Sequence, residues 1–295
     1  MKRCLCILAA MLLVTLVAVP ATAFDQPAVN LGFTSFLDGG PPSGPGFYFA
    51  EYIQYYTADK LADGPPGDPD LDVWVSLNQF LYQSDQPVLW GGQWGLDVIV
   101  PIVSFDNTAV PDNGTGLGDV LVGPYLQWMK MSPAGPPKFM QRVELQMLVP
   151  TGKYDSAAAL NPGSNFFSFN PYWSGTYFFN PRLTASCRLH YLWNAENNDT
   201  NHQAGQAIHA NFAAAYDFIP DKLRAGINGY FFKQISDSET NNVAVAGKEQ
   251  VFGIGPGVLY KFSPDSYLFC NVYFETGAEY RPEGERINLR FVHHF

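Results

Sequence analysis

The last ten residues of the chain, 286–295, alternate between two kinds of side chain. One set is mostly apolar and consists of Ile287, Leu289, Phe291, His293 and Phe295. The other is mostly polar and consists of Asn288, Arg290, Val292 and His294. A period of two places these sets on opposite faces of a β-strand. An isolated strand is not stable, so the rest of the chain has to supply partners for this one.

Further strand-like runs, bounded by turn residues, recur along the whole sequence. The clearest run, 182–194, alternates over its whole length, with Cys187 on the mostly apolar face that begins at Leu183 and Arg188 on the polar face that begins at Arg182. The predicted runs, about twelve in all, are 47–58, 71–83, 88–105, 117–130, 138–149, 167–179, 182–194, 204–218, 222–235, 248–262, 266–280 and 286–295.

The connections between these runs are mostly long and short in turn. Residues 196–202 form a long polar loop, whereas Asn180-Pro181 is a tight turn. Membrane barrels show this asymmetry, with short periplasmic turns and longer outer loops. Two connections fit less well, because 131–137 is long for an inner turn and 281–285 is short for an outer loop.

The amino-terminus has the pattern of an export signal. Two basic residues precede an apolar stretch, 4–19, and an Ala-x-Ala site ends at Ala23. We expect residues 1–23 to be a signal peptide cleaved near Ala23. Residues 24–46 are rich in Gly and Pro and form a flexible lead-in, either periplasmic or inserted into a lumen. The barrel itself is expected over 47–295.

Composition separates a membrane barrel from other exported β proteins. No later segment contains the roughly 20 continuous apolar residues of a spanning helix. Aromatic residues make up 15% of the chain and charged residues only 15%, against roughly 25% charged in soluble domains. The expected fold is therefore all-β, a closed antiparallel transmembrane barrel of about twelve strands, since closure pairs every backbone group within lipid.

In a membrane barrel the apolar faces point to lipid and the polar faces to the lumen. Apolar faces carry aromatic residues near strand ends, as interfacial girdles require: Trp94, Trp128, Tyr191, Trp193, Tyr216, Phe218, Phe262 and Phe295. The candidate lumen-lining residues are Asp97, Asp119, Arg142, Glu144, Arg182, Arg188, His190, His209, Asp217, Arg224, Glu275 and Arg290.

No catalytic, cofactor-binding or metal-binding residues are predicted. His190 and His209 could face each other across adjacent strands, but a metal site needs three or four convergent ligands. No Gly-x-Ser-x-Gly nucleophile motif occurs, so an enzyme is not expected. Cys187 and Cys270 fall on outward faces of strands that are not neighbours, which predicts two free thiols.

The most distinctive internal motif begins with Gly116-Leu-Gly-Asp119 and runs through Pro124 to Trp128. Two glycines beside the aspartate indicate tight packing. With Val149-Pro-Thr-Gly152 and the terminal Phe, the motif resembles the family named for a protein of the meta-pathway of phenol degradation. That resemblance covers nearly the whole mature chain. It implies an outer-membrane barrel, labelled a transporter in this family, and uptake of hydrophobic or aromatic small molecules.

The sequence leaves two functions open. The first is a passive outer-membrane channel for small, hydrophobic or aromatic molecules, with selectivity set by lumen residues. The alternative is a structural or adhesive barrel with a plugged lumen. Prolines at 101, 124, 171 and 256 are also places where strand pairing could break and the wall could open to lipid.

Two partners follow from the location, bacterial outer-membrane lipid and the barrel-assembly machinery, the latter through the strand ending at Phe295. The net charge of −10 argues against nucleic acid as a partner.

Overall fold

The computed structural model describes residues 25–40, 44–63, 70–108, 110–133 and 137–295. The expected signal peptide and its cleavage site lie outside these residues. Over the part of the chain that the structure describes, no helix is long and apolar enough to cross a membrane.

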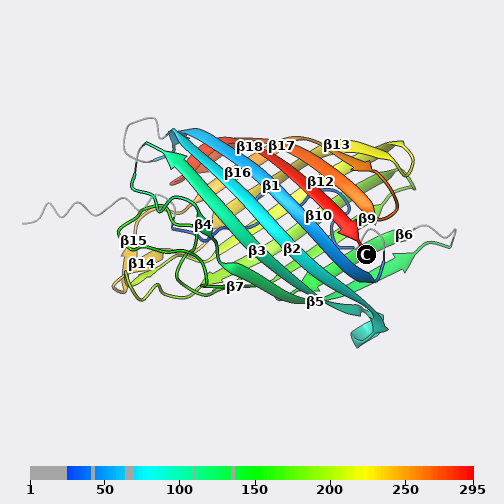
Figure 1. The fold of residues 1–295 in the computed structure, drawn as a ribbon, viewed down its shortest axis with the longest axis horizontal. Coiled ribbons are helices and arrows are strands. Elements are labelled where there is room, and N and C mark those ends of the chain that lie inside the picture. The colour runs from blue at the N-terminus through cyan, green and yellow to red at the C-terminus, as the bar shows by residue number, and fades with distance from the viewer. Residues whose placement is uncertain (1–24, 41–43, 64–69, 109, 134–136) are drawn as a thin grey trace, which may run out of the picture.

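Twelve antiparallel strands close into a barrel (Figure 1). Ten are continuous: β1 (Gly46–Leu61), β2 (Leu71–Pro87), β3 (Gln93–Asn107), β5 (Val120–Met131), β10 (Leu183–Asn194), β12 (Ala207–Ile219), β13 (Leu223–Gln234), β16 (Gln250–Lys261), β17 (Ser266–Glu279) and β18 (Pro282–His294). Two have a break: β6 (Pro137–Glu144) with β7 (Met147–Val149), and β8 (Ser168–Phe169) with β9 (Tyr172–Phe178). A short piece, β4 (Gly116–Leu117), precedes β5 along the same wall.

The terminal strand closes the barrel as its alternation predicts. β18 pairs with β1 from Tyr48↔His294 to Leu61↔Pro282, and with β17 on its other side. Leu289 and Phe291 are exposed on the outer surface, whereas Arg290 lines the interior. Because every strand has two neighbours, the sheet has no free edge, and the predicted closed barrel is confirmed.

The two ends of the barrel differ. At one end, which we call the short-turn end, lie the carboxy-terminus and the tight connections, such as the one between β9 and β10 (Figure 1). At the other, the long-loop end, extended loops carry a small sheet of β11 (His202–Gln203), β14 (Ser238–Thr240) and β15 (Val243–Val245). This small sheet was not predicted.

The turn between β2 and β3 corrects one prediction. The sequence indicates a turn at 84–87, but β2 continues to Pro87, which pairs with Gln93. A short 3₁₀ turn, η1 (Leu89–Gly91), reverses the chain instead. Trp90 and Gly91 both have positive φ in this turn. The turn is apolar and exposed, and it lacks the polar residues usual in tight turns.

The outer surface is apolar, as a lipid-facing surface requires. Seven of the eight aromatic side chains assigned to the girdles are exposed, and Trp128 is half-buried. Cys187 and Cys270 are free thiols on β10 and β17. The interior, unlike the outer surface, contains many polar and charged side chains. The fully buried ones include Tyr230, Glu144 and Gln54.

Residues 25–40, which we call the plug, lie inside the barrel. Asp25 contacts His202 and Ser238 at the long-loop end, and Gly39 packs against Gly175 toward the other end. The apolar plug residues Leu31, Phe33 and Phe36 are all buried. Of the two positions that the sequence left open for the lead-in, the structure therefore places the described part in the lumen.

Candidate functional site

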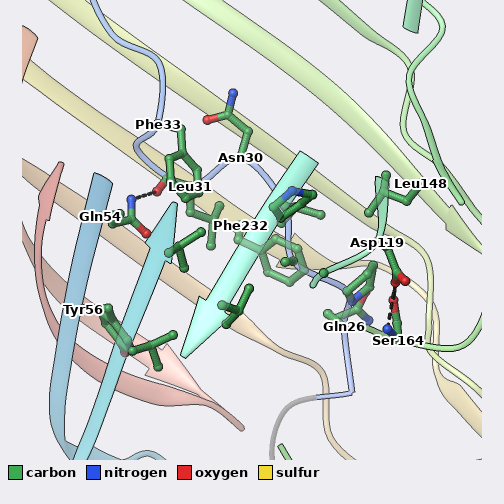
Figure 2. A pocket seen from close by; sticks show the side chains of 18 of the residues that line it. Gln26, Asn30, Leu31, Phe33, Gln54, Tyr56, Asp119, Leu148, Ser164 and Phe232 are labelled. Atoms are coloured by element: carbon green, nitrogen blue, oxygen red, sulfur yellow. Dashed lines mark hydrogen bonds between the residues drawn. The ribbon is translucent and has the colours of Figure 1, made fainter. Parts of the chain in front are cut away.

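A cavity of about 1530 Å³ runs beside the plug. It reaches Val110 and Val243 among the long loops and Tyr48 and Tyr267 toward the short-turn end. Typical small-molecule sites have volumes of about 300–1,000 Å³, so this one has room for more than one small ring or for a long chain. Figure 2 shows part of its lining, with Leu31 and Phe33 of the plug near Gln54 of β1.

One wall of the cavity is apolar. It is formed by the inward residues of β2 and β3 in the half nearer the long loops: Leu71, Val73, Val75, Leu77, Ile99, Pro101, Val103 and Phe105. Strand alternation puts these residues on one surface, because every second residue of each strand points inward. The plug contributes Val29, Leu31 and Phe33 to the same cavity. The apolar lining of the cavity therefore comes from the barrel wall on one side and from the plug on the other.

The plug is fixed to the rest of the barrel by polar side chains that bind its backbone. Asn211 accepts a hydrogen bond from the Gly32 N–H at 2.8 Å, and Asn288 donates to the Gly32 carbonyl at 3.2 Å. Ser186 accepts from the Leu37 N–H at 3.1 Å. Because these groups satisfy the buried backbone, the plug needs no secondary structure of its own. Its apolar side chains remain available to pack in the core and to line the cavity.

An ion pair completes this attachment. The Arg188 guanidinium donates two hydrogen bonds to the Asp38 carboxylate, at 2.8 Å and 2.5 Å, and both side chains are buried. Such bidentate pairs are directional as well as strong. Asp38 was not among the predicted site residues. The only sequence signal for it was that it is one of two acids, with Asp25, in the Gly/Pro-rich segment 24–46.

Nearer the short-turn end the cavity lining becomes polar. We call this region the polar belt and define it as Tyr52, Gln79, Asp97, Arg142 and Arg290. Tyr52 donates to Gln79 at 2.8 Å, and Gln79 donates to Asp97 at 2.6 Å. Arg142 stacks on Tyr125, with its guanidinium carbon 3.9 Å from the ring centre. The polar belt therefore lines the cavity with charged groups and an amide, whereas the half of the cavity nearer the long loops is lined by residues such as Val and Leu.

The structure brings five of the predicted lumen residues to the cavity: Asp97, Asp119, Arg142, Arg188 and Arg290. Others lie inside the barrel but away from that space. Glu144 accepts a hydrogen bond from Tyr172 at 2.5 Å, and Arg224 forms an ion pair with Asp217 at 2.6 Å. Glu275 pairs at 3.1 Å with Arg286, a buried arginine that the sequence reasoning missed.

The two predicted histidines do face each other. His190 and His209 are paired residues of β10 and β12, and their rings stack at 4.0 Å with an interplanar angle of 14°. His209 also contacts Asn170 at 3.0 Å. Both rings are buried, so they pack as part of the interior and do not line the cavity.

Arg182 requires a correction. Alternation placed it on the lumen face, but the residue is exposed in the turn before β10, which begins at Leu183. Its carbonyl accepts a hydrogen bond from the Asp217 N–H at 2.9 Å. This bond lies one residue beyond the pair Leu183↔Tyr216, where the strand reaches the turn, so the Arg182 side chain is exposed at the end of the barrel and does not line the cavity.

Asp119 of the distinctive motif joins the barrel wall to the loop after β7. Its carboxylate accepts hydrogen bonds from the Gly152 N–H at 2.9 Å and the Ser164 N–H at 2.7 Å, and from the Ser164 hydroxyl (Figure 2). Gly152 and Gly163 pack so closely that a Cβ on either would meet the other's backbone. The predicted tight packing is therefore present, and it attaches the loop after β7 to the barrel mouth.

Comparison with known families fits this geometry. The model of the family described as "Putative MetA-pathway of phenol degradation" matches residues 45–291, which is nearly all of the described barrel. The chain belongs to this family. The resemblance inferred from the motif is therefore confirmed. No curated protein sequence matches the chain.

Solved structures resemble this family member in fold. The COG4313 outer membrane channel from Pseudomonas putida F1 aligns with a TM-score of 0.76 at 16% identity, covering 91% of this chain and 100% of that one. The KdgM porin aligns with a TM-score of 0.42 at 12% identity, covering 83% and 99%. The CymD monoaromatic hydrocarbon channel aligns with a TM-score of 0.42 at 10% identity, covering 85% and 89%. At 16% identity, the likeness to the COG4313 channel shows the barrel fold alone.

Proposed function

We propose that this protein is a passive channel of the bacterial outer membrane that admits small apolar or aromatic molecules. The observation that carries the proposal is the cavity beside the plug. The half of this cavity nearer the long loops is lined by β2, β3 and apolar plug residues. Binding there requires no chemistry, because burial of apolar surface alone favours entry by roughly 25 cal/mol per Å².

The location follows from the same fold. The lipid-facing band of exposed aromatic and aliphatic side chains is suited to a bilayer, and closure of β18 on β1 removes unpaired edges. We place the long-loop end outside the cell, because outer-membrane barrels have their long loops there. The terminal strand ending at Phe295 is the segment that the assembly machinery would recognise.

The lumen is less suited to the passage of a polar molecule. The plug fills much of the interior, and in the polar belt the Asp97 carboxylate already accepts a hydrogen bond from Gln79. Sixteen or more strands enclose an open aqueous channel, whereas eight leave room only for side chains. With twelve strands and a plug, this barrel fits slow passage of small apolar solutes better than bulk diffusion of hydrophilic ones.

The alternative is a structural or adhesive barrel, and the plug is the observation that favours it. The two functions predict different uptake rates of N-phenyl-1-naphthylamine, an apolar dye that becomes fluorescent on entering a bilayer. Cells producing the protein should take up the dye faster than cells with an empty vector. Equal rates, together with no swelling of proteoliposomes in sugar solutions, would leave the structural function as the better account.

A matched pair of variants ties uptake to the cavity. Leu77→Asn puts a polar side chain of similar size into the apolar wall, while the neighbouring change Asn78→Gln lies on the outward face of the same strand. Dye uptake should fall for Leu77→Asn and stay unchanged for Asn78→Gln. The opposite result would mean that the dye does not pass through the cavity.

A further inference from the structure

One arginine inside the barrel differs from the others in having no acid beside it. Arg290 of β18 lines the cavity and is half-buried. It forms no ion pair with any residue that the structure describes, and its Nε has no hydrogen-bond partner among them. The other interior arginines of the described barrel each pair with an acid: Arg142 with Glu144, Arg188 with Asp38, Arg224 with Asp217, Arg281 with Glu249 and Arg286 with Glu275.

The groups packed around Arg290 are aromatic. Its guanidinium carbon lies 3.6 Å from the centre of the Phe269 ring and 5.6 Å from that of Tyr52. Both rings belong to a buried apolar cluster that also contains Phe33 of the plug. Contact with ring faces offsets part of the cost of burying a guanidinium, but it supplies no negative charge. A neutral side chain would pack against the same rings without that cost, so packing does not account for an arginine here.

Two acids in this part of the lumen already bind other groups. Asp38 accepts two hydrogen bonds from Arg188, and Asp97 accepts one from Gln79. Asp97 lies on β3 and Arg290 on β18, with β2 and β1 between them. Three strand spacings correspond to about 14 Å across the wall. Arg290 is therefore a cation that can accept an acidic ligand without displacing an acid of the protein.

The space beside Arg290 continues into the apolar wall. Arg290 pairs with Tyr52 of β1, and Tyr52 pairs on its other side with Leu77 of β2. Leu77 and Val75 line the cavity, as does Phe33 of the plug. Two strand spacings, about 10 Å, separate the backbone of the arginine from that of the apolar wall. A molecule of this length can place its apolar body against Leu77 while a terminal acid reaches Arg290.

We propose that Arg290 binds the acidic head group of an amphipathic cargo, a small aromatic or aliphatic molecule that carries one acidic group. This inference rests on the proposed function and names a class of substrate within it. A guanidinium presents N–H donors in a fork that matches two oxygens of a carboxylate or sulfonate. An acidic ligand gives Arg290 the counter-charge it lacks, whereas a neutral ligand leaves that charge unpaired.

Two dyes with the same ring system test the assignment. The dye 8-anilino-1-naphthalenesulfonate is N-phenyl-1-naphthylamine with a sulfonate added, and both become fluorescent in apolar surroundings. Each is titrated against the purified protein in phosphatidylcholine nanodiscs, with empty nanodiscs as the blank. Arg290→Gln removes the charge and Arg290→Lys keeps it. The matched control, Arg182→Gln, removes an exposed arginine that does not line the cavity.

We expect Arg290→Gln to weaken binding of the sulfonate dye about tenfold or more, because a charge-assisted hydrogen bond is lost. Binding of the neutral dye should stay unchanged. Arg290→Lys should keep most of the sulfonate binding, and Arg182→Gln all of it. In the unchanged protein, 1-naphthoate should displace the sulfonate dye better than the neutral 1-naphthalenemethanol does. Heat-dependent mobility on SDS gels shows whether each variant is folded.

Unchanged binding of the sulfonate dye in Arg290→Gln, or equal loss of both dyes, would overturn the assignment. If Arg290→Gln does not fold, competition on the unchanged protein decides. Preferential displacement by 1-naphthoate then supports the assignment, and equal displacement by the two competitors overturns it. The channel function is judged separately by entry of the neutral dye into cells. Entry above the vector with no preference for acids leaves the channel standing, whereas no entry above the vector removes the channel and this inference with it.

Discussion

At the scale of residues, two ion pairs of this barrel differ sharply in how much they contribute to stability. The pair of Asp38 and Arg188 is buried, whereas the pair of Lys60 and Glu283, at 2.6 Å, has a lysine whose side chain is 61% exposed. Removing one partner of a buried pair leaves an uncompensated charge, which costs about 3–5 kcal/mol. An exposed pair contributes about 0–1 kcal/mol. Proximity alone therefore does not rank these two pairs, and burial does.

We predict that Asp38→Asn loosens the plug, because Arg188 then keeps its charge in the interior without a carboxylate. Hydrogen exchange should accelerate at the Gly32 and Leu37 amides, which are bonded to Asn211 and Ser186. Lys60→Ala should leave the exchange rates of both amides as they are. Unchanged protection in Asp38→Asn would mean that the backbone contacts hold the plug without the ion pair.

A second residue-scale prediction concerns pH at the long-loop end. Burial raises the pKa of Glu249 to about 8, with the nearby Asp25 carboxylate adding to the rise and Arg281, at 3.4 Å, opposing it. Between the unfolded value of about 4.3 and this folded value, the folded state holds a proton that the unfolded state has released. The stability that this proton contributes is complete below the unfolded pKa and is lost as pH rises through about 8.

Glu249→Gln keeps the shape but removes the ionisation. Relative to the unchanged protein, the variant should gain thermal stability as pH is raised from about 6 to about 9. The temperature at which the barrel loses its compact mobility on SDS gels provides the measurement. A difference between the two proteins that stays constant with pH would show that Glu249 does not titrate in this range.

At the scale of elements, the plug fits the barrel through close packing at several glycines, and Gly32 is the one that contacts an aromatic ring. Gly32 has φ +82, and a Cβ added to it would meet the Tyr273 ring at 2.7 Å. Gly44 has φ +97 but nothing within 4 Å. Replacing either by Ala incurs the cost of a left-handed residue, roughly 1–2 kcal/mol. Only the Gly32 change adds a steric clash.

We therefore predict that Gly32→Ala displaces the plug from Tyr273 and that Gly44→Ala does not. Protease cleavage within residues 25–40 should become faster in Gly32→Ala alone. Because both variants share the backbone penalty, the difference between them measures the packing. Equal cleavage of the two variants would place the weak point of the plug elsewhere.

The elements themselves were largely predictable, and the exceptions have local causes. Alternation along 182–194 and 286–295 is readable because each strand has one lipid face and one lumen face. The sequence named Pro124 and Pro171 as places where pairing could break, but it did not show on which side. Pro124 stays paired with Leu96 of β3 and is unpaired toward β6 and β7, whereas Pro171 is unpaired on both sides. The small sheet of β11, β14 and β15 forms between distant loops, and its short pieces carry no period of their own.

At the scale of the whole molecule, the site depended on a segment whose position the sequence left open. The Gly/Pro-rich lead-in has no periodicity, so nothing in it distinguished the periplasm from the lumen. Once it lies inside, residues such as Asp97 and Arg290 lie beside a cavity, whereas Asp217 and Glu275 become ion-pair partners. Which polar lumen residues line the cavity thus depends on the plug and on ion pairs between strands, and not on strand alternation alone.

The direction in which the plug is threaded constrains how the protein is made. Residue 25 lies at the long-loop end, while β1 starts at the other end and pairs with the last strand to complete the wall. A chain delivered from the periplasm has to carry its leading segment through the ring before β1 and β18 meet, or pass it through afterwards. A folded domain fused ahead of residue 25 would have to make the same passage. Biogenesis, rather than activity, would be the first property to fail in such a fusion.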